Sequence, residues 1–184
     1  MAGARVPPEI EIVARRSRSH VGGMERIEPG PGRESVWDYP RPPRVEPVAE
    51  TVKVVHGGGV LAESRRALRV LETSHPPTYY IPASDVAMQR LMCVAGKTSF
   101  CEFKGTAQYW ALTDDPERIV AWSYASPSSG FEAIADHLCF YASQVDEAWV
   151  GDEQAKAQAS DFYGGWITSK VVGPFKGPPG TSGW

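Results

Sequence analysis

The residues best suited to chemistry gather in a polar and aromatic run between positions 71 and 82. The run reads Leu-Glu-Thr-Ser-His-Pro-Pro-Thr-Tyr-Tyr-Ile-Pro, so it holds an acid, an imidazole and two phenols. Glu72 and His75 can transfer a proton if their side chains converge, and the prolines would hold them rigidly in place. The alternative is that Glu72 and His75 tie down a turn while the tyrosines fill the core.

A second candidate lies in the segment Cys101-Glu102-Phe103-Lys104-Gly105. The alternation of a strand puts Glu102 and Lys104 on one face and Cys101 and Phe103 on the other. If the first face lines a cavity, Lys104 can bind an anion and Glu102 can act as a base. Otherwise the two form a surface ion pair of little energetic value. Cys101 is expected to be core rather than a nucleophile, because no sequence signature supplies a base for it.

Aromatic residues with small neighbours form a third group. Trp122 and Tyr124 alternate onto one face of a predicted strand, and Tyr163 precedes Gly164-Gly165 and Trp166. Paired glycines between large rings permit the close approach of a backbone or a ligand. Such rings are either core or the walls of a ligand cleft with a few polar groups.

Several other chemistries are excluded by spacing. Gly57-Gly58-Gly59 is not followed by the Gly-Lys-Ser/Thr of a phosphate loop, and no serine lies in a G-x-S-x-G elbow. The three cysteines, at 93, 101 and 139, include no C-x-x-C pair, and the histidines lack metal-ligand spacing. We therefore predict neither a metal nor a cofactor, and we expect reduced thiols in a cytoplasmic protein.

The elements that would position these residues lie in the middle of the 184-residue chain. Residues 1–36 contain no aromatic residue and are predicted to be a flexible extension, 37–177 a single domain, and 178–184 a Gly/Pro-rich tail. The net charge of -3 argues against a general nucleic-acid binder. No apolar run is long enough to span a bilayer, so no membrane partner is expected.

Short strands separated by turns dominate the predicted domain. Residues 51–56 alternate polar and apolar side chains, Gly57-Gly58-Gly59 turns, and 60–63 return as the second strand of a hairpin. Further strands are expected at 99–104, 107–113, 119–124, 138–141 and 145–150. Short helices are predicted near 84–91 and 131–135. The fold class is therefore mainly β, with antiparallel sheets and two or three short helices.

Ordered blocks of residues then carry a resemblance to a known family. The segment from Trp37 to Gly177 resembles the uncharacterised bacterial and fungal family called domain of unknown function 427. The blocks are WDYPRPP (37–43), LETSHPPTYYIP (71–82), CEFKG (101–105) with Tyr109-Trp110, AWSY (121–124), Phe140-Tyr141 with Val145-Asp146, FYGGW (162–166) and VVGPFKG (171–177). The family often has Trp where Phe103 stands here.

The resemblance implies a β-tent, two antiparallel sheets packed at a steep angle, as in methionine-R-sulfoxide reductases and the thalidomide-binding domain of cereblon. Those relatives usually carry a zinc knuckle, for which this sequence lacks the cysteines. By analogy a cleft between the sheets is lined by Glu72, His75, Tyr79, Tyr80, Glu102, Lys104, Trp110, Trp122, Tyr124 and Tyr163. The family sometimes carries a nucleotidyltransferase label, which the absence of converging acids and of a phosphate cradle does not favour.

The leading hypothesis is a domain, monomeric or homodimeric, that binds an unknown small molecule in this aromatic-lined polar cleft. The first alternative is an enzyme, a transferase or a reductase, with Glu72 or Glu102 as base and His75 or Lys104 stabilising negative charge. In the reductase version Cys101 or Cys139 would be the nucleophile. The second alternative is a non-enzymatic interaction module.

Overall fold

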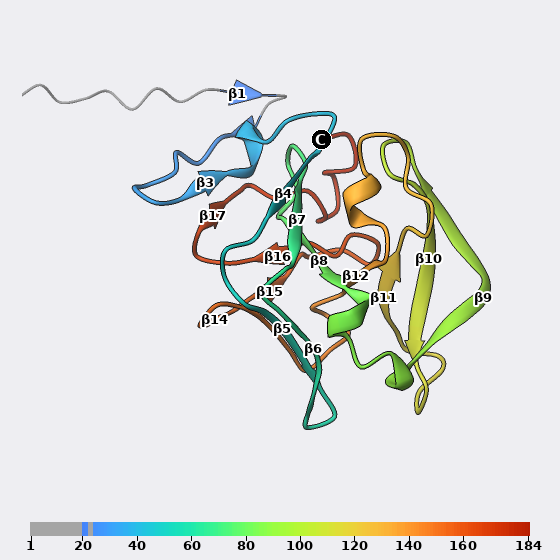
Figure 1. The fold of residues 1–184 in the computed structure, drawn as a ribbon. Coiled ribbons are helices and arrows are strands. Elements are labelled where there is room, and N and C mark those ends of the chain that lie inside the picture. Colours follow the sequence, from blue (N-terminus) through green and yellow to red (C-terminus); the bar gives the residue numbers. More distant parts are fainter. Residues whose placement is uncertain (1–19, 22–23) are drawn as a thin grey trace, which may run out of the picture.

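The computed structural model describes residues 20–21 and 24–184, and Figure 1 shows their arrangement. The predicted extension therefore lies partly outside the described residues. As predicted, the fold is mainly β and its larger sheets are antiparallel. Two sheets dominate, with seven and four strands, and three two-stranded pairs are added around them. No helix within the described part of the chain is long and apolar enough to cross a membrane.

The seven-stranded sheet has the order β4-β7-β8-β12-β11-β10-β9, and all its neighbours are antiparallel. Its strands in chain order are β4 (Arg44–Pro47), β7 (Leu68–Leu71), β8 (Thr78–Pro82), β9 (Leu91–Cys101), β10 (Gly105–Leu112), β11 (Ile119–Ser123) and β12 (His137–Phe140). The strands β8, β10 and β11 of this sheet carry the candidate residues Tyr79, Tyr80, Trp110 and Trp122. The turns between its strands carry Glu72, His75, Glu102 and Lys104.

The four-stranded sheet has the order β14-β13-β5-β6, with β5 at Val52–His56, β6 at Gly59–Ser64, β13 at Glu147–Val150 and β14 at Glu153–Gln154. The predicted hairpin is confirmed, since β5 pairs with β6 in antiparallel register. Gly57 and Gly58 have φ angles of 61° and 71°, the left-handed conformation that a two-residue hairpin turn requires.

The remaining strands form three two-stranded pairs. They are β1 (His20–Val21) with β2 (Met24–Glu25), β15 (Lys156–Ala157) with β16 (Trp166–Ile167), and β3 (Glu34–Ser35) with β17 (Val171–Val172). The last pair is parallel. It joins the end of the predicted extension to a strand near the opposite end of the chain.

The prediction of two or three short helices was wrong. The described residues form no α-helix, and their helical turns are 3-10 turns of three residues: η1 (Val36–Asp38), η2 (Ala83–Asp85), η3 (Met88–Arg90) and η4 (Glu132–Ile134). The segment between β8 and β9 divides into η2 and η3, and each makes a single i→i+3 turn before the chain becomes extended again.

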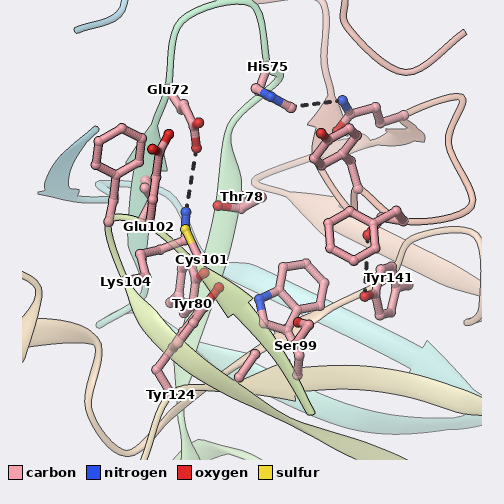
Figure 2. Close-up of a pocket in the computed structure, with 18 of the residues that line it drawn as sticks. Glu72, His75, Thr78, Tyr80, Ser99, Cys101, Glu102, Lys104, Tyr124 and Tyr141 are labelled. Carbon is pink, nitrogen blue, oxygen red and sulfur yellow. Dashed lines mark hydrogen bonds and ion pairs between the residues drawn. The ribbon is translucent and has the colours of Figure 1, made fainter. Parts of the chain in front are cut away.

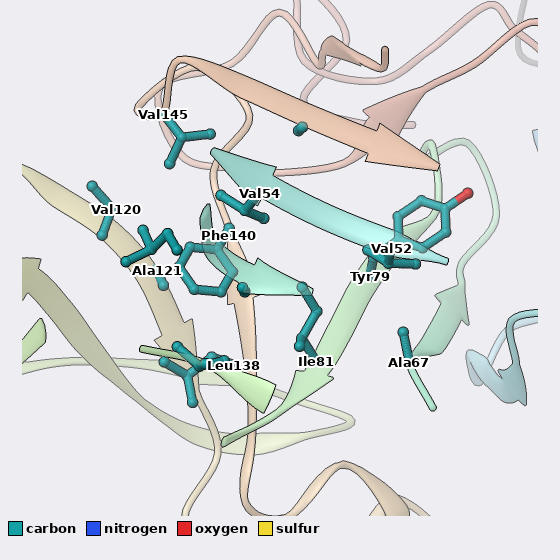
Figure 3. Packing of buried hydrophobic residues seen from close by; sticks show 14 of the residues in the cluster. Val52, Val54, Ala67, Tyr79, Ile81, Val120, Ala121, Leu138, Phe140 and Val145 are labelled. Atoms are coloured by element: carbon teal, nitrogen blue, oxygen red, sulfur yellow. The ribbon is translucent and has the colours of Figure 1, made fainter. Parts of the chain in front are cut away.

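The two faces of the seven-stranded sheet pack against different parts of the protein. One face packs on the four-stranded sheet and forms the main core, in which Ile81, Leu138 and Phe140 share one cluster with Val52 and Val54 of β5 (Figure 3). The other face carries a second cluster around Tyr80, Trp122 and Cys139. Because alternate residues of one strand point to opposite faces, the strands β8, β11 and β12 contribute to both clusters.

The chain enters the domain earlier than the predicted boundary at residue 37. Glu34 and Ser35 pair with β17, and the side chain of Val36 is fully buried against Leu71 and Val171. Near the other end of the chain, Trp184 of the predicted tail packs on Trp37 with ring centroids 5.7 Å apart. These flanking residues are therefore part of the folded unit.

Candidate functional site

A cavity of about 260 Å³ lies on the face of the seven-stranded sheet that points away from the four-stranded sheet. Its floor is formed by alternate residues of strands of this sheet, among them Thr78 and Tyr80 of β8 and Trp122 of β11. Its walls come from the turn after β7, the β9–β10 hairpin and the loop before β16. Figure 2 shows the polar side chains gathered around it.

Eight of the ten residues predicted for the cleft line this cavity: Glu72, His75, Tyr80, Glu102, Lys104, Trp122, Tyr124 and Tyr163. The predicted location between the two sheets needs correction, because the space between the principal sheets is filled by the hydrophobic core. The cavity instead occupies the opposite face of one sheet, where loops provide the second wall.

Tyr79 and Trp110 do not line the cavity. Tyr79 belongs to the core between the sheets, where its ring centroid is 5.1 Å from that of Trp166. Trp110 packs on the same core, and its Nε1 donates a hydrogen bond of 2.9 Å to Ser123 Oγ. Strand alternation is the reason, since Tyr80 and Tyr109 are the neighbours that face the cavity.

Lys104 and Glu72 form an ion pair within the cavity. The Nζ of Lys104 lies 3.5 Å from Oε2 of Glu72, and only 8% of the Lys104 residue is exposed. Lys104 lies at the end of the β9–β10 turn, where its carbonyl accepts a hydrogen bond from the backbone N–H of Ser128. The pair is long for a charge-assisted hydrogen bond, which leaves the ammonium available to a third group.

Glu102 belongs to the rim rather than to the floor. Its carboxylate accepts a hydrogen bond of 2.6 Å from Arg41, and 63% of its side chain is exposed. Arg41 also lies over the ring of Phe103, 5.2 Å from the centroid. The predicted Glu102–Lys104 partnership is thus replaced by two separate pairs, because the turn directs these side chains to different depths.

His75 is held by the turn that joins β7 to β8. Its backbone N–H donates to the carbonyl of Glu72, while Ser74 adopts a left-handed φ of 70°. The carbonyl of Ser74 in turn accepts a hydrogen bond from the N–H of Lys176. Burial lowers the pKa of His75 to about 4 against an opposing effect of Glu72, so the imidazole is neutral at pH 7.

The tautomer of His75 follows from the contacts of Gln158. The Oε1 of Gln158 accepts from the N–H of Gly165, and its Nε2 donates to the carbonyl of Lys176, which fixes the amide orientation. The same Nε2 lies 3.2 Å from Nδ1 of His75. Because an amide nitrogen is only a donor, Nδ1 must be the acceptor, and the imidazole proton resides on Nε2.

Aromatic rings form the wall opposite the ion pair. Trp122 lies 4.5 Å from Tyr141 between centroids, and Tyr163 meets His75 edge-on at the same separation. Gly164 makes this packing possible, because a Cβ there would lie 2.5 Å from the ring of Trp122. The predicted close approach is confirmed for the backbone: Gly164 lies against the rings of Trp122 and Tyr141, and Gly165 lies against Gln158 and Pro76.

Two phenols lie at the floor of the cavity. Tyr80 is fully buried and Tyr124 is 5% exposed, and burial raises the pKa of both hydroxyls so that they are neutral. The Tyr80 hydroxyl has no partner with normal hydrogen-bond geometry among the residues that the structure describes. Against the larger effect of burial, Trp122 and Thr78 nevertheless lie close enough to lower its pKa as donors to its oxygen, and its own proton has no acceptor among the described residues. Burying a hydroxyl without a partner is costly, so this group is available for a ligand.

The cysteines of the region are free thiols. Cys139 is fully buried, and burial raises its pKa well above the ordinary value, so its thiolate is disfavoured. Cys101 is half-buried and lines the cavity, rather than lying in the core as predicted. Strand alternation alone cannot distinguish a core from a cavity when both faces of a sheet are covered.

Sequence reasoning missed other lining residues: Arg41, Thr78, Ser99, Tyr109, Tyr141, Gln158 and Lys176. Strand alternation could have found Thr78, which lies two residues before Tyr80 on the same face of β8. Tyr109 shares a face with Trp122, its partner on the neighbouring strand β11. Gln158 and Lys176 come from irregular segments that lack periodicity, so no sequence signal could have found them.

No cluster of three or more His, Cys, Asp or Glu side chains suited to a metal ion occurs in the part of the chain that the structure describes. A family model described as "Domain of unknown function (DUF427)" matches residues 44–151. No curated protein matches the chain. The matched segment contains β4 to β13, and therefore both principal sheets except β14.

Proposed function

Because the chain belongs to the family described as domain of unknown function DUF427, and that description names no activity, we propose a function from the cavity itself. The cavity binds a small molecule. The observation that carries this proposal is the presence of Glu72, His75 and Lys104 in one cavity with the rings of Trp122 and Tyr163. Ligand sites typically combine apolar and aromatic walls with a few such polar groups.

The polar and the apolar groups that a ligand could contact lie at different depths in the cavity. The buried Lys104 and the unpaired hydroxyl of Tyr80 offer hydrogen bonds inside, where water competes least. Phe100 and Phe162, which are 76% and 58% exposed, line the cavity further out. Exposed phenylalanines are costly in water, and contact with an apolar part of a ligand would offset that cost.

The fold and the composition supply further parts of this proposal. The two principal sheets are consistent with the β-tent that the family resemblance implies. The free cysteines favour a cytoplasmic location, and the net charge of -3 gives no reason to propose nucleic acid as a partner. We also propose a monomer or homodimer, which light scattering will distinguish.

The test is a thermal-shift screen of a metabolite library against the wild type, Lys104→Met and Lys53→Met. Lys53 is the matched control, because it loses the same charge on β5, where it lies over Trp149. A compound that raises the wild-type and Lys53→Met melting temperatures, but not that of Lys104→Met, would support the proposal. If no compound raises the wild-type melting temperature, the proposal fails.

A second proposal is acid–base catalysis in the same cavity. The observation that favours it is the mostly buried Glu72–Lys104 pair beside neutral His75 and two neutral phenols. Glu72 would accept a proton, and the donors would stabilise negative charge on the substrate. Mass spectrometry of screen hits incubated with wild type and Glu72→Gln tests it: turnover that persists in Glu72→Gln would contradict this role.

A further inference from the structure

We infer that the ligand presents a carboxylate to the floor of the cavity, between Lys104 and the phenols Tyr80 and Tyr124, and a flat ring to Trp122. This inference rests on the proposed small-molecule function and names the chemical class of its ligand. It follows from the hydrogen-bond donors that remain unused inside the cavity and from the lining, which holds one more cation than carboxylates.

The fully buried Tyr80 hydroxyl is the first argument. It lines the cavity and has no hydrogen-bond partner among the described residues. In Figure 2 the hydroxyls of Tyr80 and Tyr124 lie in the same part of the cavity as Lys104. Since burial keeps both phenols protonated, each retains a proton to donate.

Lys104 and His75 add further donors. Of the three ammonium protons of Lys104, Glu72 engages one, at a long 3.5 Å. Gln158 occupies Nδ1 of His75, so the Nε2–H of that ring remains. The inner cavity therefore holds several unused donors, and at least one of them is charged.

The two carboxylates, in contrast, each face a cation. Glu72 faces Lys104, and Glu102 accepts from Arg41. With Lys176, whose Nζ donates to the backbone oxygen of Trp184 at 2.8 Å, three cations and two carboxylates line the cavity, while His75 is neutral. A ligand that supplies one negative charge and two acceptor oxygens would balance both the charge and the hydrogen bonds.

A monoanion fits this floor better than a dianion. Among the three described cations that line the cavity, Lys104 is the one that is buried, since Arg41 is half exposed at the rim and Lys176 is half-buried. Burial of a second negative charge without a second buried cation carries a desolvation penalty that is not repaid. A carboxylate is thus favoured over a phosphate monoester.

The rings determine the rest of the ligand. Gly164 brings Trp122 to the wall, and Tyr141 and Tyr163 extend the aromatic surface. Offset or edge-on contact with such rings favours a flat, conjugated body. An aromatic carboxylate would contact both the donors at the floor of the cavity and the rings of its wall.

The test is titration of the full chain by two-dimensional NMR with matched probes. Benzoate, phenylacetate and indole-3-acetate are each compared with the corresponding amide, and phenyl phosphate and acetate complete the panel. We expect at least one ring carboxylate to bind tenfold or more tightly than its amide, to bind more tightly than phenyl phosphate, and to shift the Trp122 indole resonance.

Two variants and two matched controls locate the carboxylate. Tyr80→Phe and Lys104→Met are expected to weaken binding of the best carboxylate about tenfold or more, whereas Tyr79→Phe and Lys53→Met leave it unchanged. Tyr79 is the neighbouring phenol on the opposite face of β8, and Lys53 lies on another sheet. Lys104→Arg, which keeps the charge, should bind more tightly than Lys104→Met.

Three outcomes would overturn the inference: equal affinity for amide and carboxylate, tighter binding of phenyl phosphate, or unchanged binding by both cavity variants. If only uncharged compounds from the library screen bind, the ligand class is wrong but the proposed function stands. If no compound binds at all, the proposed function itself fails, and the inference fails with it.

Discussion

Tyr80 combines full burial with a hydroxyl that lacks a partner, and this combination has a measurable consequence for stability. Removing an unsatisfied buried hydroxyl removes its desolvation penalty, so Tyr80→Phe should stabilise the ligand-free protein by about 1 kcal/mol. Urea unfolding followed by tryptophan fluorescence measures the difference. A gain in stability together with a loss of ligand affinity would mark Tyr80 as a residue that serves binding.

Tyr79→Phe is the control for this prediction. Tyr79 is buried on the other face of the same strand, and its pKa is raised to about 12 by burial, but its hydroxyl is not an orphaned group. We expect its loss to leave stability unchanged or to lower it slightly. Equal stabilisation by both changes would contradict the assignment of a special cost to the Tyr80 hydroxyl.

The neutral state of His75 makes stability depend on pH in a defined direction. Its pKa is about 4 in the folded chain and about 6.5 in the unfolded chain, so the unfolded chain binds the proton first as the pH falls. The free energy of unfolding that this pKa difference contributes is fully present above pH 6.5. It is lost as the pH falls from 6.5 to 4, and the loss is about 3 kcal/mol at most. Melting temperatures measured across this range test the prediction.

His75→Gln removes the titrating group and should flatten the decline in melting temperature between pH 6.5 and 4. His137, a half-buried histidine that lines no part of the cavity, is the control. His137→Gln should retain the wild-type slope. A wild-type slope in His75→Gln would show that other groups cause the acid sensitivity.

At the residue scale, the sequence predicted which residues could do chemistry better than it predicted which residues they contact. Glu72, His75 and Lys104 were named from residue type and spacing, and all three line the cavity. The partnership of Glu72 with Lys104, however, joins two chain segments 32 residues apart. Such contacts depend on the tertiary fold, which residue spacing does not encode.

At the scale of elements, strand alternation determines which aromatic residues face the cavity. Tyr79 and Tyr80 are adjacent, as are Tyr109 and Trp110, so only one of each pair can face it. The strands β10, β11 and β12 lie close to their predicted ranges, but the predicted strand at 99–104 was wrong, because β9 spans Leu91–Cys101 and residues 102–104 form the turn. The family resemblance placed both tyrosines and Trp110 in the cleft. Strict use of strand alternation would have excluded one residue of each pair from the cleft. It could not have identified which of the two residues faces the cleft.

The loop before β16 gives the element-scale prediction. Gly164 lies against Trp122, and a Cβ added there would meet the ring at 2.5 Å. Gly164→Ala should therefore displace Trp122, lower stability by about 1–3 kcal/mol and weaken ligand binding. Urea unfolding and the near-ultraviolet circular dichroism of Trp122 report the two effects.

Gly183→Ala is the matched control, because a Cβ at Gly183 meets nothing within 4 Å and its backbone is not left-handed. We expect this change to alter stability by less than about 0.5 kcal/mol. An unchanged near-ultraviolet spectrum in Gly164→Ala would mean that Trp122 accommodates the methyl group. In that case Gly164 would not be needed for the cavity wall.

At the scale of the whole molecule, one sheet serves two purposes. Its inner face builds the main core with the four-stranded sheet, and its outer face carries the cavity. Composition and strand patterning predicted a mainly β fold, because that class depends on local periodicity. They could not predict that the core and the cavity lie on opposite faces, because both faces of the central strands are apolar and covered.

The boundary of the folded unit leads to the last prediction. A chain that starts at Glu34 retains β3 and the fully buried Val36, whereas one that starts at Trp37 loses both. It also loses the carboxylate of Glu34, which accepts from Tyr39 at 2.8 Å and pairs with Arg69 at 3.0 Å.

Burial of one valine contributes about 1.5–3 kcal/mol, so the shorter chain should be destabilised by at least about 2 kcal/mol relative to the longer one. The two chains differ by three residues, and urea unfolding compares them directly. If residues 34–36 instead belonged to a dispensable extension, the two midpoints would coincide. Because Val36 packs against Leu71 at the end of β7, the residue before Glu72, the shorter chain should also bind the cavity ligand more weakly.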